Sequence, residues 1–357
     1  MTRVWDVPVH DSTRVRDVRV AAEAAADHTG LGRDRRAAAA LVATELATNL
    51  LKHGGGGRIL IDTVDADLAP PGTGRGPALQ IAALDHGPGI ADLDAALRDG
   101  FSTTASLGAG LGTCRRIADR FEVHTVPGQG TVALARVQAA RRDRPGHRVP
   151  DPSAPVRAGG INVPLAGAAF SGDAWACVRT DDHVSLLLAD GLGHGEAAAK
   201  ASGAAVDQLH HWAHLPPADL LGQLHTALRD TRGAAVAVAR LDLAAGRLDF
   251  AGIGNVGARL LTGDTWRPLL SHPGIVGAHR PARLPHCRVP WTADSLLVLH
   301  SDGLPSRWTP PAGAPPIAWD PAVTAAVIVR DSSSAARPVR DDTTVAVLTP
   351  TPQDHRR

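Results

Sequence analysis

Apolar and polar positions recur along this chain with two periods, one typical of helices and one typical of strands. In the first part of the chain they predict a strand at 3–9, helices at 13–28 and 33–53, strands at 58–65 and 78–85, a helix at 113–120, and strands at 121–126 and 130–137. Ser12 is expected to cap the first helix and Gly30 to end it. This mixed order predicts an α/β (α+β) domain over residues 1–137.

Strands dominate the pattern after residue 157. The expected strands lie at 157–166, 174–180, 183–190, 234–242, 246–253, 256–262, 295–300 and 343–349, and the expected helices at 195–213, 217–230 and 320–330. Strands that follow strands, with paired helices between them, predict a β-sandwich flanked by helices over residues 158–349. Residues 138–157 are rich in arginine and proline, which predicts a solvated linker, and residues 350–357 form a tail.

Composition narrows the class of protein. The 357 residues suffice for two cores, and these are aliphatic because tyrosine is lacking and phenylalanine is rare. A formal charge of +1 gives no reason to expect a nucleic acid or a membrane surface as a partner. The three cysteines are widely spaced and odd in number, which argues against disulfides or structural zinc. With no long apolar segment, a soluble cytoplasmic protein is expected.

Acidic residues stand at the ends of several predicted strands in the second half. Asp190-Gly191 follows an apolar run, and Asp173, Asp302 and the pair Asp341–Asp342 stand at comparable positions. An isolated Asp-Gly is most often a turn. Four separated acids that converge at strand ends would instead form an oxygen-rich pocket suited to two Mg²⁺ or Mn²⁺ ions and a water nucleophile.

A second group of candidate residues lies in the first half. Glu45 and Asn49 are four residues apart and share one helix face, where they could serve a nucleotide's metal and its attacking group, although such a pair is more often a solvated face. Asp85 could accept a hydrogen bond from an adenine amino group, and Gly87 and Gly89 would let the backbone approach the ring.

Alternating glycines precede the helix predicted at 113–120. Gly108, Gly110 and Gly112 would place free N–H groups and a helix N-terminus near an anion, as in a phosphate cradle. No strand precedes these glycines, so a Rossmann dinucleotide site is not expected.

Taken in order, these stretches and Gly130-Thr131 resemble the boxes of the GHKL ATPase superfamily, most closely the serine/threonine kinases of the RsbT/RsbW group. The resemblance covers residues 1–137 and implies a Bergerat-type α/β sandwich that binds Mg-ATP under a lid at about 90–110. It implies Asn49 as the magnesium ligand, Glu45 as the base for the acceptor hydroxyl and Asp85 on adenine. The implied nucleotide-binding set is Glu45, Asn49, Asp85, Gly87, Gly89, Gly108, Gly110, Gly112 and Thr131. No histidine-bearing dimerisation helix precedes the domain, which argues against a sensor histidine kinase.

The acids of the second half resemble the motifs of SpoIIE-type phosphatases in the type 2C superfamily, which have a four-layer αββα sandwich. The resemblance implies that Asp190 bridges two metal ions, with the Gly191 carbonyl on one and Asp302 and Asp341 on the other. It further implies that Asp173 holds metal-bound water, with Asp342 as the alternative to Asp341. The glycine-rich turn at 252–257, which includes Asn255, is interpreted first as a hairpin and second as a substrate-facing turn. His194 is expected beside the site but not as a metal ligand, because a histidine in a loop is more often structural.

A kinase and a phosphatase on one chain would perform opposing reactions, which predicts a switch. The resemblance implies a STAS-domain anti-sigma antagonist or a similar phosphoprotein as the partner, with a sigma factor or a second copy as further possibilities. ATP with one Mg²⁺, and two Mg²⁺ or Mn²⁺ ions in the phosphatase site, are the expected cofactors. Two alternatives remain: the first domain binds ATP only to sequester a partner, or it senses nucleotide and regulates the phosphatase.

Overall fold

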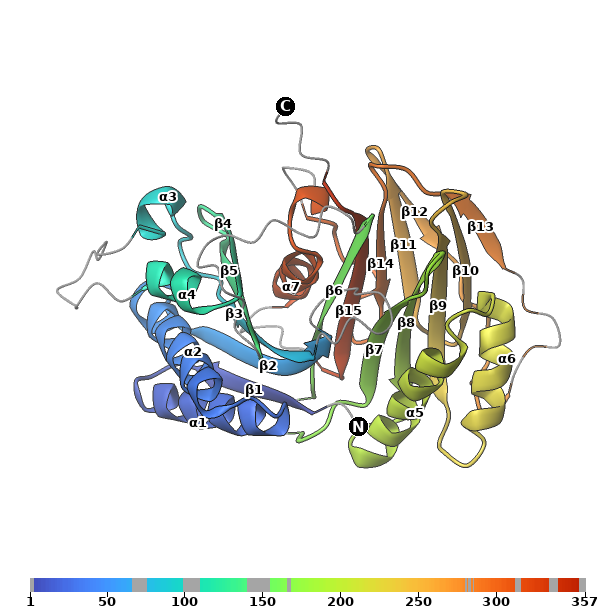
Figure 1. The fold of residues 1–357 in the computed structure, drawn as a ribbon, viewed down its shortest axis with the longest axis horizontal. Helices are drawn as coiled ribbons and strands as arrows, with labels where there is room; N and C mark the ends of the chain where they lie inside the picture. The colour runs from blue at the N-terminus through green and yellow to red at the C-terminus, as the bar shows by residue number, and fades with distance from the viewer. Residues whose placement is uncertain are drawn as a thin grey trace. The chain divides into compact units, whose positions relative to one another are not determined.

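The computed structural model describes residues 3–65, 76–98, 110–139, 155–165, 168–279, 281, 284, 286–311, 316–333 and 340–352. Gly108, the centre of the predicted lid, most of the predicted linker and the end of the predicted tail lie outside these residues. The chain separates into two compact units, one with strands β1 to β5 and one with strands β6 to β15 (Figure 1). Within the described residues, no helix combines the length and the apolar character needed to cross a membrane.

The first unit is one antiparallel sheet covered by helices on one face (Figure 1). Its strand order is β1-β2-β3-β5-β4, with bounds Val4–Val9, Gly57–Asp65, Pro77–Leu84, Gly130–Gln138 and Arg120–Val126. Its helices are α1 (Thr13–His28), α2 (Arg33–His53), the short α3 (Leu93–Ala96) and α4 (Leu111–Ile117). Alanine, valine, leucine and isoleucine side chains fill the space between the helices and the sheet. The predicted α/β sandwich is confirmed.

The ends of α1 show one prediction that is right and one that is wrong. Gly30 follows the helix with a φ of 74°, in the left-handed region where glycine is favoured. Ser12 occupies the N-cap position, but its side chain makes no capping hydrogen bond. Asp11 Oδ1 instead accepts a bond of 2.8 Å from the Thr13 N–H. The carboxylate one residue earlier thus satisfies the first N–H of the helix, whereas an N-cap serine would accept from Arg14 or Val15.

The second unit has two antiparallel sheets. The first, in the order β13-β10-β9-β8-β7, has strands Cys287–Pro290, Arg247–Ile253, Ala234–Asp242, His183–Gly191 and Asp173–Arg179. The second, in the order β12-β11-β14-β15-β6, has strands Thr265–Leu269, Gly257–Thr262, Leu296–His300, Thr343–Pro350 and Val156–Val163. Apolar side chains from both sheets form a shared core.

Helices cover the outer faces of both sheets in this unit. The helices α5 (Glu196–Trp212) and α6 (Pro217–Ala227) pack on the first sheet. A short 3-10 turn at Pro316–Ala318 precedes α7 (Pro321–Ser332), which contacts β6 and β15 of the second sheet. The predicted four-layer αββα sandwich is therefore confirmed.

The segment Gly252–Gly257 is not the hairpin that the sequence suggested. The strand before it, β10, pairs with β9 and β13, whereas the strand after it, β11, pairs with β12 and β14. The segment therefore carries the chain from one sheet to the other. Gly254 makes this crossing possible with a φ of 96°, and a Cβ there would lie 2.4 Å from the Cβ of Ala235.

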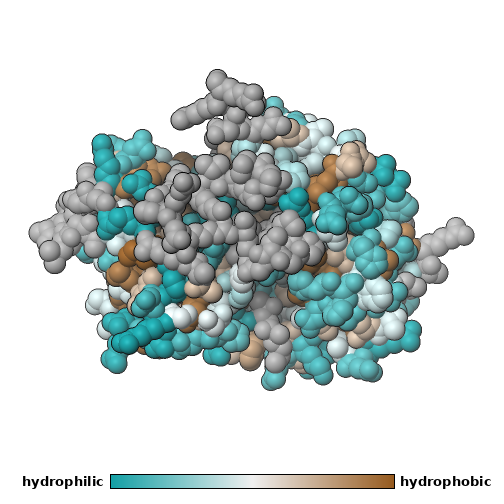
Figure 2. Space-filling view, viewed as in Figure 1, coloured by the Kyte–Doolittle hydropathy of each residue, from teal (hydrophilic) through white to brown (hydrophobic). Residues whose placement is uncertain are grey.

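On the face drawn in Figure 2, hydrophilic residues cover most of the described surface and apolar residues occupy separate small areas. Few large apolar side chains stay exposed in the described part of the chain. Two of them, Val20 (56%) and Leu41 (42%), lie on α1 and α2.

Candidate active sites

The acids of the second unit are positioned by the two-residue period of its strands. In β8, Leu186 and Leu188 face the core between the two sheets, so Asp190 continues the same inward face at the end of the strand. In the antiparallel pair β7–β8, Asp173 lies directly opposite Asp190. The Gly191 N–H donates a bond of 3.0 Å to the Gly172 carbonyl oxygen and fixes this register. Two carboxylates therefore meet at one end of the sandwich core.

The second sheet brings the remaining acids to the same place. Asp302 follows β14, and Asp341 and Asp342 precede β15, which is the neighbour of β14. Ser301 ties the two strands because its N–H donates to the Thr344 carbonyl at 3.0 Å and its Oγ accepts from the Thr344 N–H at 2.9 Å.

Glycine is required beside Asp302 by close packing. A Cβ at Gly303 would lie 2.2 Å from the carbonyl oxygen of Asp342, which is a severe clash. The Ser-Asp-Gly sequence therefore lets β14 and β15 approach one another at the site.

These carboxylates raise one another's pKa. Burial, followed by the charges of Asp302 and Asp341, raises the pKa of Asp190 to about 7. Burial and the charge of Asp341 raise the pKa of Asp302. Burial and the charge of Asp190 raise the pKa of Asp173 well above its usual value, although a hydrogen bond from Ser301 opposes this. Crowded acids of this kind gain from a cation that neutralises them.

The chemistry of the donors fits a hard divalent cation. Asp173 Oδ2 is buried and has no hydrogen-bond partner among the described residues, and the other donors are also oxygens. No three His, Cys, Asp or Glu side chains in the described ranges are arranged to enclose a metal ion by themselves. Backbone carbonyl, water and phosphate oxygens would therefore have to complete the coordination.

Asp341 and Asp342 have different surroundings. Asp342 is buried, and its two carboxylate oxygens accept from the Leu165 N–H at 2.7 Å and the Gly172 N–H at 2.9 Å. Asp341 is exposed, and its Oδ1 accepts from the Asp342 N–H at 2.8 Å. These bonds give Asp342 a role in holding the segment before Asp173, and they favour Asp341 as the predicted metal ligand.

Asn255 has a contact with the site that sequence reasoning did not predict. Its amide donates a hydrogen bond to Asp302 Oδ2, so the crossing between the two sheets touches the acidic cluster. The surrounding glycines were the only signal in the sequence. His194 is exposed on the loop after Asp190, and its predicted structural role stays a prediction.

The first unit places Glu45 and Asn49 on α2, as expected. Glu45 is half-buried, and burial raises its pKa while the charge of Lys52 opposes the shift. The amide nitrogen of Asn49 is buried without a hydrogen-bond partner among the described residues. An unsatisfied buried amide is costly, so a ligand that pairs with it would be stabilised.

Asp85 is held by the backbone around it. Its Oδ1 accepts from the Gly87 N–H at 2.9 Å and the Thr131 N–H at 3.1 Å. A Cβ at Gly87 would lie 2.7 Å from the carbonyl oxygen of Gly54, and one at Gly130 would lie 2.1 Å from that of Asp85. Close backbone packing thus joins the end of α2 to β3 and β5 around this carboxylate.

The other predicted nucleotide-binding glycines are only partly tested by the geometry. Gly89 has a φ of 72°, and a Cβ there would lie 2.5 Å from the Val126 carbonyl oxygen. Gly110 precedes α4 with open space around it, and Gly112 is buried inside the helix. Since Gly108 lies outside the described residues, the phosphate cradle stays a prediction.

Sequence comparisons match the two halves to different families. The family model named Histidine kinase-like ATPase domain matches residues 9–136, and the model named Stage II sporulation protein E matches residues 180–350. The chain is 40% identical over 106 residues to the serine/threonine-protein kinase RsbT of Bacillus subtilis, covering 30% of this chain and 74% of RsbT. It is 24% identical over 140 residues to the phosphoserine phosphatase RsbX of Bacillus subtilis, covering 39% of this chain and 69% of RsbX.

Solved structures of phosphatases are also similar to the chain. The crystal structure of RsbX in complex with magnesium matches with a TM-score of 0.45 and 19% identity, over 55% of this chain and 95% of that one. The structure of the PP2C phosphatase domain and a fragment of the regulatory domain of SpoIIE from Bacillus subtilis matches with a TM-score of 0.45 and 15% identity, over 65% of this chain and 70% of that one.

Proposed function

We propose that this chain adds and removes phosphate on protein serine or threonine, because its first part belongs to the family of the kinase RsbT and its residues 180–350 match the model named Stage II sporulation protein E. The observation that carries the proposal is the meeting of Asp173 and Asp190 with Asp302 across the two sheets. The names of two relatives, a serine/threonine-protein kinase and a phosphoserine phosphatase, correspond to the two reactions.

The hydrolytic half would use its acids as ligands. Asp190, the Gly191 carbonyl, Asp302 and Asp341 would hold two Mg²⁺ or Mn²⁺ ions, which when bound lower the pKa of water and neutralise the phosphate. The unpartnered Oδ2 of Asp173 would accept a hydrogen bond from the attacking water and so orient it. Asp342 would keep Asp173 in place through its bond to the Gly172 N–H.

The ATP-binding half would act mainly by positioning its reactants. Asn49 would bind Mg-ATP, and Asp85 would accept a hydrogen bond from the adenine amino group. Glu45 would align the acceptor hydroxyl and take its proton, and the rise of its pKa by burial suits that task. The glycines 87, 89, 108, 110 and 112 and Thr131 would complete the nucleotide site.

We assign the acceptor to the STAS-domain anti-sigma antagonists or similar phosphoproteins, with a sigma factor as a further partner. The chain would then set the phosphorylation of one regulator in the cytoplasm, where ATP is available. Domain boundaries at 137 and 158 and homodimerisation belong to the same proposal.

Hydrolysis of p-nitrophenyl phosphate by the full chain tests the phosphatase half. We expect turnover with Mn²⁺ or Mg²⁺, loss of turnover in EDTA, and at least about a hundredfold loss in Asp190→Asn with ATP binding retained. Asp242→Asn, which changes an acid in β9 away from the cluster, is the matched control. Undiminished turnover in Asp190→Asn would remove Asp190 from the metal site.

A further inference from the structure

One arginine of the second unit lies beside the loop that begins directly after Asp190. In the antiparallel pair β8–β9, Gly191 lies opposite Ala234. Continuing this register by two residues places Arg232 opposite Gly193. A Cβ at Gly193 would lie 3.1 Å from Arg232 Nη1, so the guanidinium packs against the loop. The roles assigned above to the acidic residues do not involve this side chain.

The same loop also contacts the segment before Asp173. A Cβ at Gly172 would lie 3.2 Å from the carbonyl oxygen of Gly193. Gly193 is thus close to both Gly172 and the guanidinium of Arg232. Because Asp173 and Asp190 lie directly opposite one another, the arginine stands at the edge of the acidic cluster.

A hydrogen-bonded turn fixes the backbone on both sides of Arg232. The Gly233 N–H donates to Thr231 Oγ1 at 3.0 Å, and this hydroxyl donates to the Leu228 carbonyl oxygen at 2.7 Å. The Gly233 carbonyl oxygen accepts from the Leu192 N–H at 3.1 Å, which ties the turn to the loop after Asp190. An exposed side chain on such a fixed backbone can reach only a small region of space, and that region adjoins the site.

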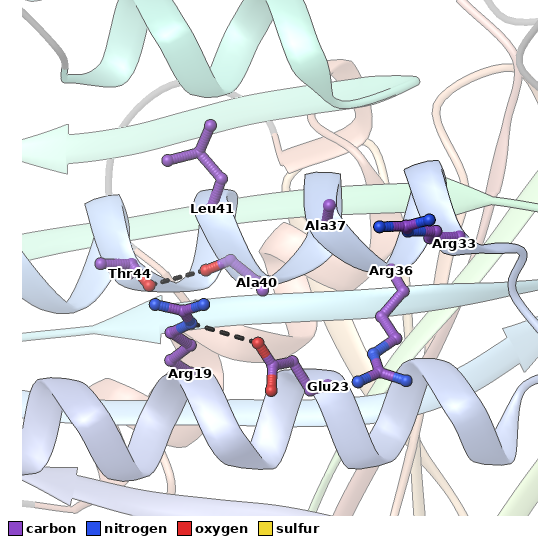
Figure 3. A pocket seen from close by; sticks show the side chains of 8 residues that line it. All are labelled: Arg19, Glu23, Arg33, Arg36, Ala37, Ala40, Leu41 and Thr44. Atoms are coloured by element: carbon purple, nitrogen blue, oxygen red, sulfur yellow. Dashed lines mark hydrogen bonds and ion pairs between the residues drawn. The ribbon is translucent and has the colours of Figure 1, made fainter.

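The guanidinium of Arg232 is available to a ligand. Within the described ranges it forms neither a hydrogen bond nor an ion pair, although the exposed Asp230 is two residues away. Arg19 provides a contrast, because in the groove between α1 and α2 its Nε bonds Glu23 at 3.1 Å (Figure 3). The five N–H donors of an unpaired guanidinium can all be offered to an anion.

We propose that Arg232 binds the phosphate group of the phosphoserine or phosphothreonine substrate, an inference that rests on the proposed phosphatase reaction. The carboxylates expected to serve the metal ions and the attacking water carry four negative charges when ionised, and these belong to Asp173, Asp190, Asp302 and Asp341. Two divalent cations would only cancel those charges, so a phosphate dianion would still lack a counter-charge. The planar fork of a guanidinium supplies one and matches two phosphate oxygens.

Inorganic phosphate is the probe that tests this proposal on the full chain with Mg²⁺. In Arg232→Ala, the KM for p-nitrophenyl phosphate and the inhibition constant of phosphate should rise by the same factor, at least about tenfold, with a smaller change in kcat. The rise in melting temperature that phosphate causes should largely disappear. Arg232→Gln should behave like Arg232→Ala, and Arg232→Lys should lose less because it keeps the charge. Arg229→Ala, which changes an exposed arginine three residues earlier, should match the wild type.

Unchanged KM and phosphate inhibition in Arg232→Ala would overturn the proposal. A parallel loss of Mg²⁺ affinity in calorimetric titration would also overturn it, because Arg232 would then only support the loop beside Asp190. If the wild type hydrolyses no p-nitrophenyl phosphate, the proposed phosphatase function fails, and the melting temperatures with and without phosphate still decide whether Arg232 binds phosphate. Should Arg232→Ala unfold, Arg232→Gln decides the question in its place.

Discussion

At the scale of single residues, neighbouring aspartates in one motif have different partners. Both carboxylate oxygens of Asp342 accept hydrogen bonds from backbone N–H groups that lie far away in the sequence. Asp341 is exposed, next to Asp190 and Asp302. The order of the motif alone could not distinguish a ligand from a positioning residue. The hydrogen bonds make Asp342 the better candidate for positioning and leave Asp341 as the proposed ligand.

Replacing each of these aspartates by asparagine should therefore have different results. Asp342→Asn turns one acceptor into a donor that faces the Leu165 or Gly172 N–H, so we expect it to destabilise the fold by about 1–3 kcal/mol. Asp341→Asn should leave stability unchanged and weaken Mn²⁺ binding. Urea denaturation and calorimetric Mn²⁺ titration measure the two effects. The opposite pattern would make Asp342 the ligand.

Proton binding should compete with metal binding at Asp190. Its pKa is raised to about 7, mainly by burial and then by Asp302, and a metal ion requires the ionised carboxylate. We expect the affinity for Mn²⁺ to rise by up to about tenfold per pH unit below that pKa and to level off above it. Titration at several pH values measures this, and an affinity that does not depend on pH would contradict it.

The raised pKa of Asp190 also determines whether the stability of the metal-free protein rises or falls with pH. Because the folded-state pKa lies above the ordinary value of 3.8, the contribution of this carboxyl is complete below that value and is lost as the pH rises through about 7. In EDTA, the stability of the second unit should fall over this range. Asp190→Asn should remove part of that fall, and an unchanged profile in the variant would count against the assignment.

At the scale of elements, a buried ion pair ties the start of α2 to the far edge of its sheet. Arg35 forms an ion pair with Asp119, and its Nε donates to the Gln138 carbonyl at 2.9 Å. The same carboxylate accepts from the Gln138 N–H at 2.8 Å. The helix that carries Glu45 and Asn49 is therefore fixed at one end by two bonds of Arg35, and the third bond holds Asp119 beside Gln138.

Arg35→Ala should leave the mostly buried carboxylate of Asp119 without its ion-pair partner, which costs about 3–5 kcal/mol of stability. Arg36→Ala, the next residue, breaks only an exposed pair with Asp27 and should cost about 0–1 kcal/mol. Chemical denaturation of the two variants compares them directly. Equal losses would show that burial of the Arg35 pair has no special effect.

Local pattern predicted most elements but not how they join. The helix predicted at 33–53 matches α2 because Gly32 and Gly54 stop the helical pattern at both ends. The strands β12 and β13 were missed because one contains a proline and the other has only four residues. The crossing at 252–257 was wrongly predicted as a hairpin because the local sequence does not determine which sheet the next strand will join.

In the candidate sites too, local sequence pattern does not reveal which distant residues come into contact. Periodicity placed Asp190 at the end of a buried strand, and the structure adds that Asp173 lies opposite it. The contact of Asn255 with Asp302 joins residues 47 positions apart, and that of Asp342 with Gly172 joins residues 170 apart. Such pairings come from the sandwich as a whole, so single motifs could not reveal them.

At the scale of the whole molecule, we propose that one chain carries two opposing activities towards one acceptor. The two family matches fall on consecutive parts of the chain, which supports two domains of different families in one protein. Each activity has a residue whose change should remove it alone: Asp190 for hydrolysis and Asn49 for transfer.

Transfer of label from γ-labelled ATP to a STAS-domain acceptor shows whether the chain carries both activities. Wild type, Asp190→Asn and Asn49→Ala are each incubated with Mg²⁺ or Mn²⁺, and label is followed on the acceptor and as free phosphate. We predict that label accumulates on the acceptor in Asp190→Asn, is released as phosphate by the wild type, and never transfers in Asn49→Ala. If no variant transfers label while the wild type still dephosphorylates a phosphorylated acceptor, the first domain only binds or senses nucleotide and the claim of two opposing activities is wrong.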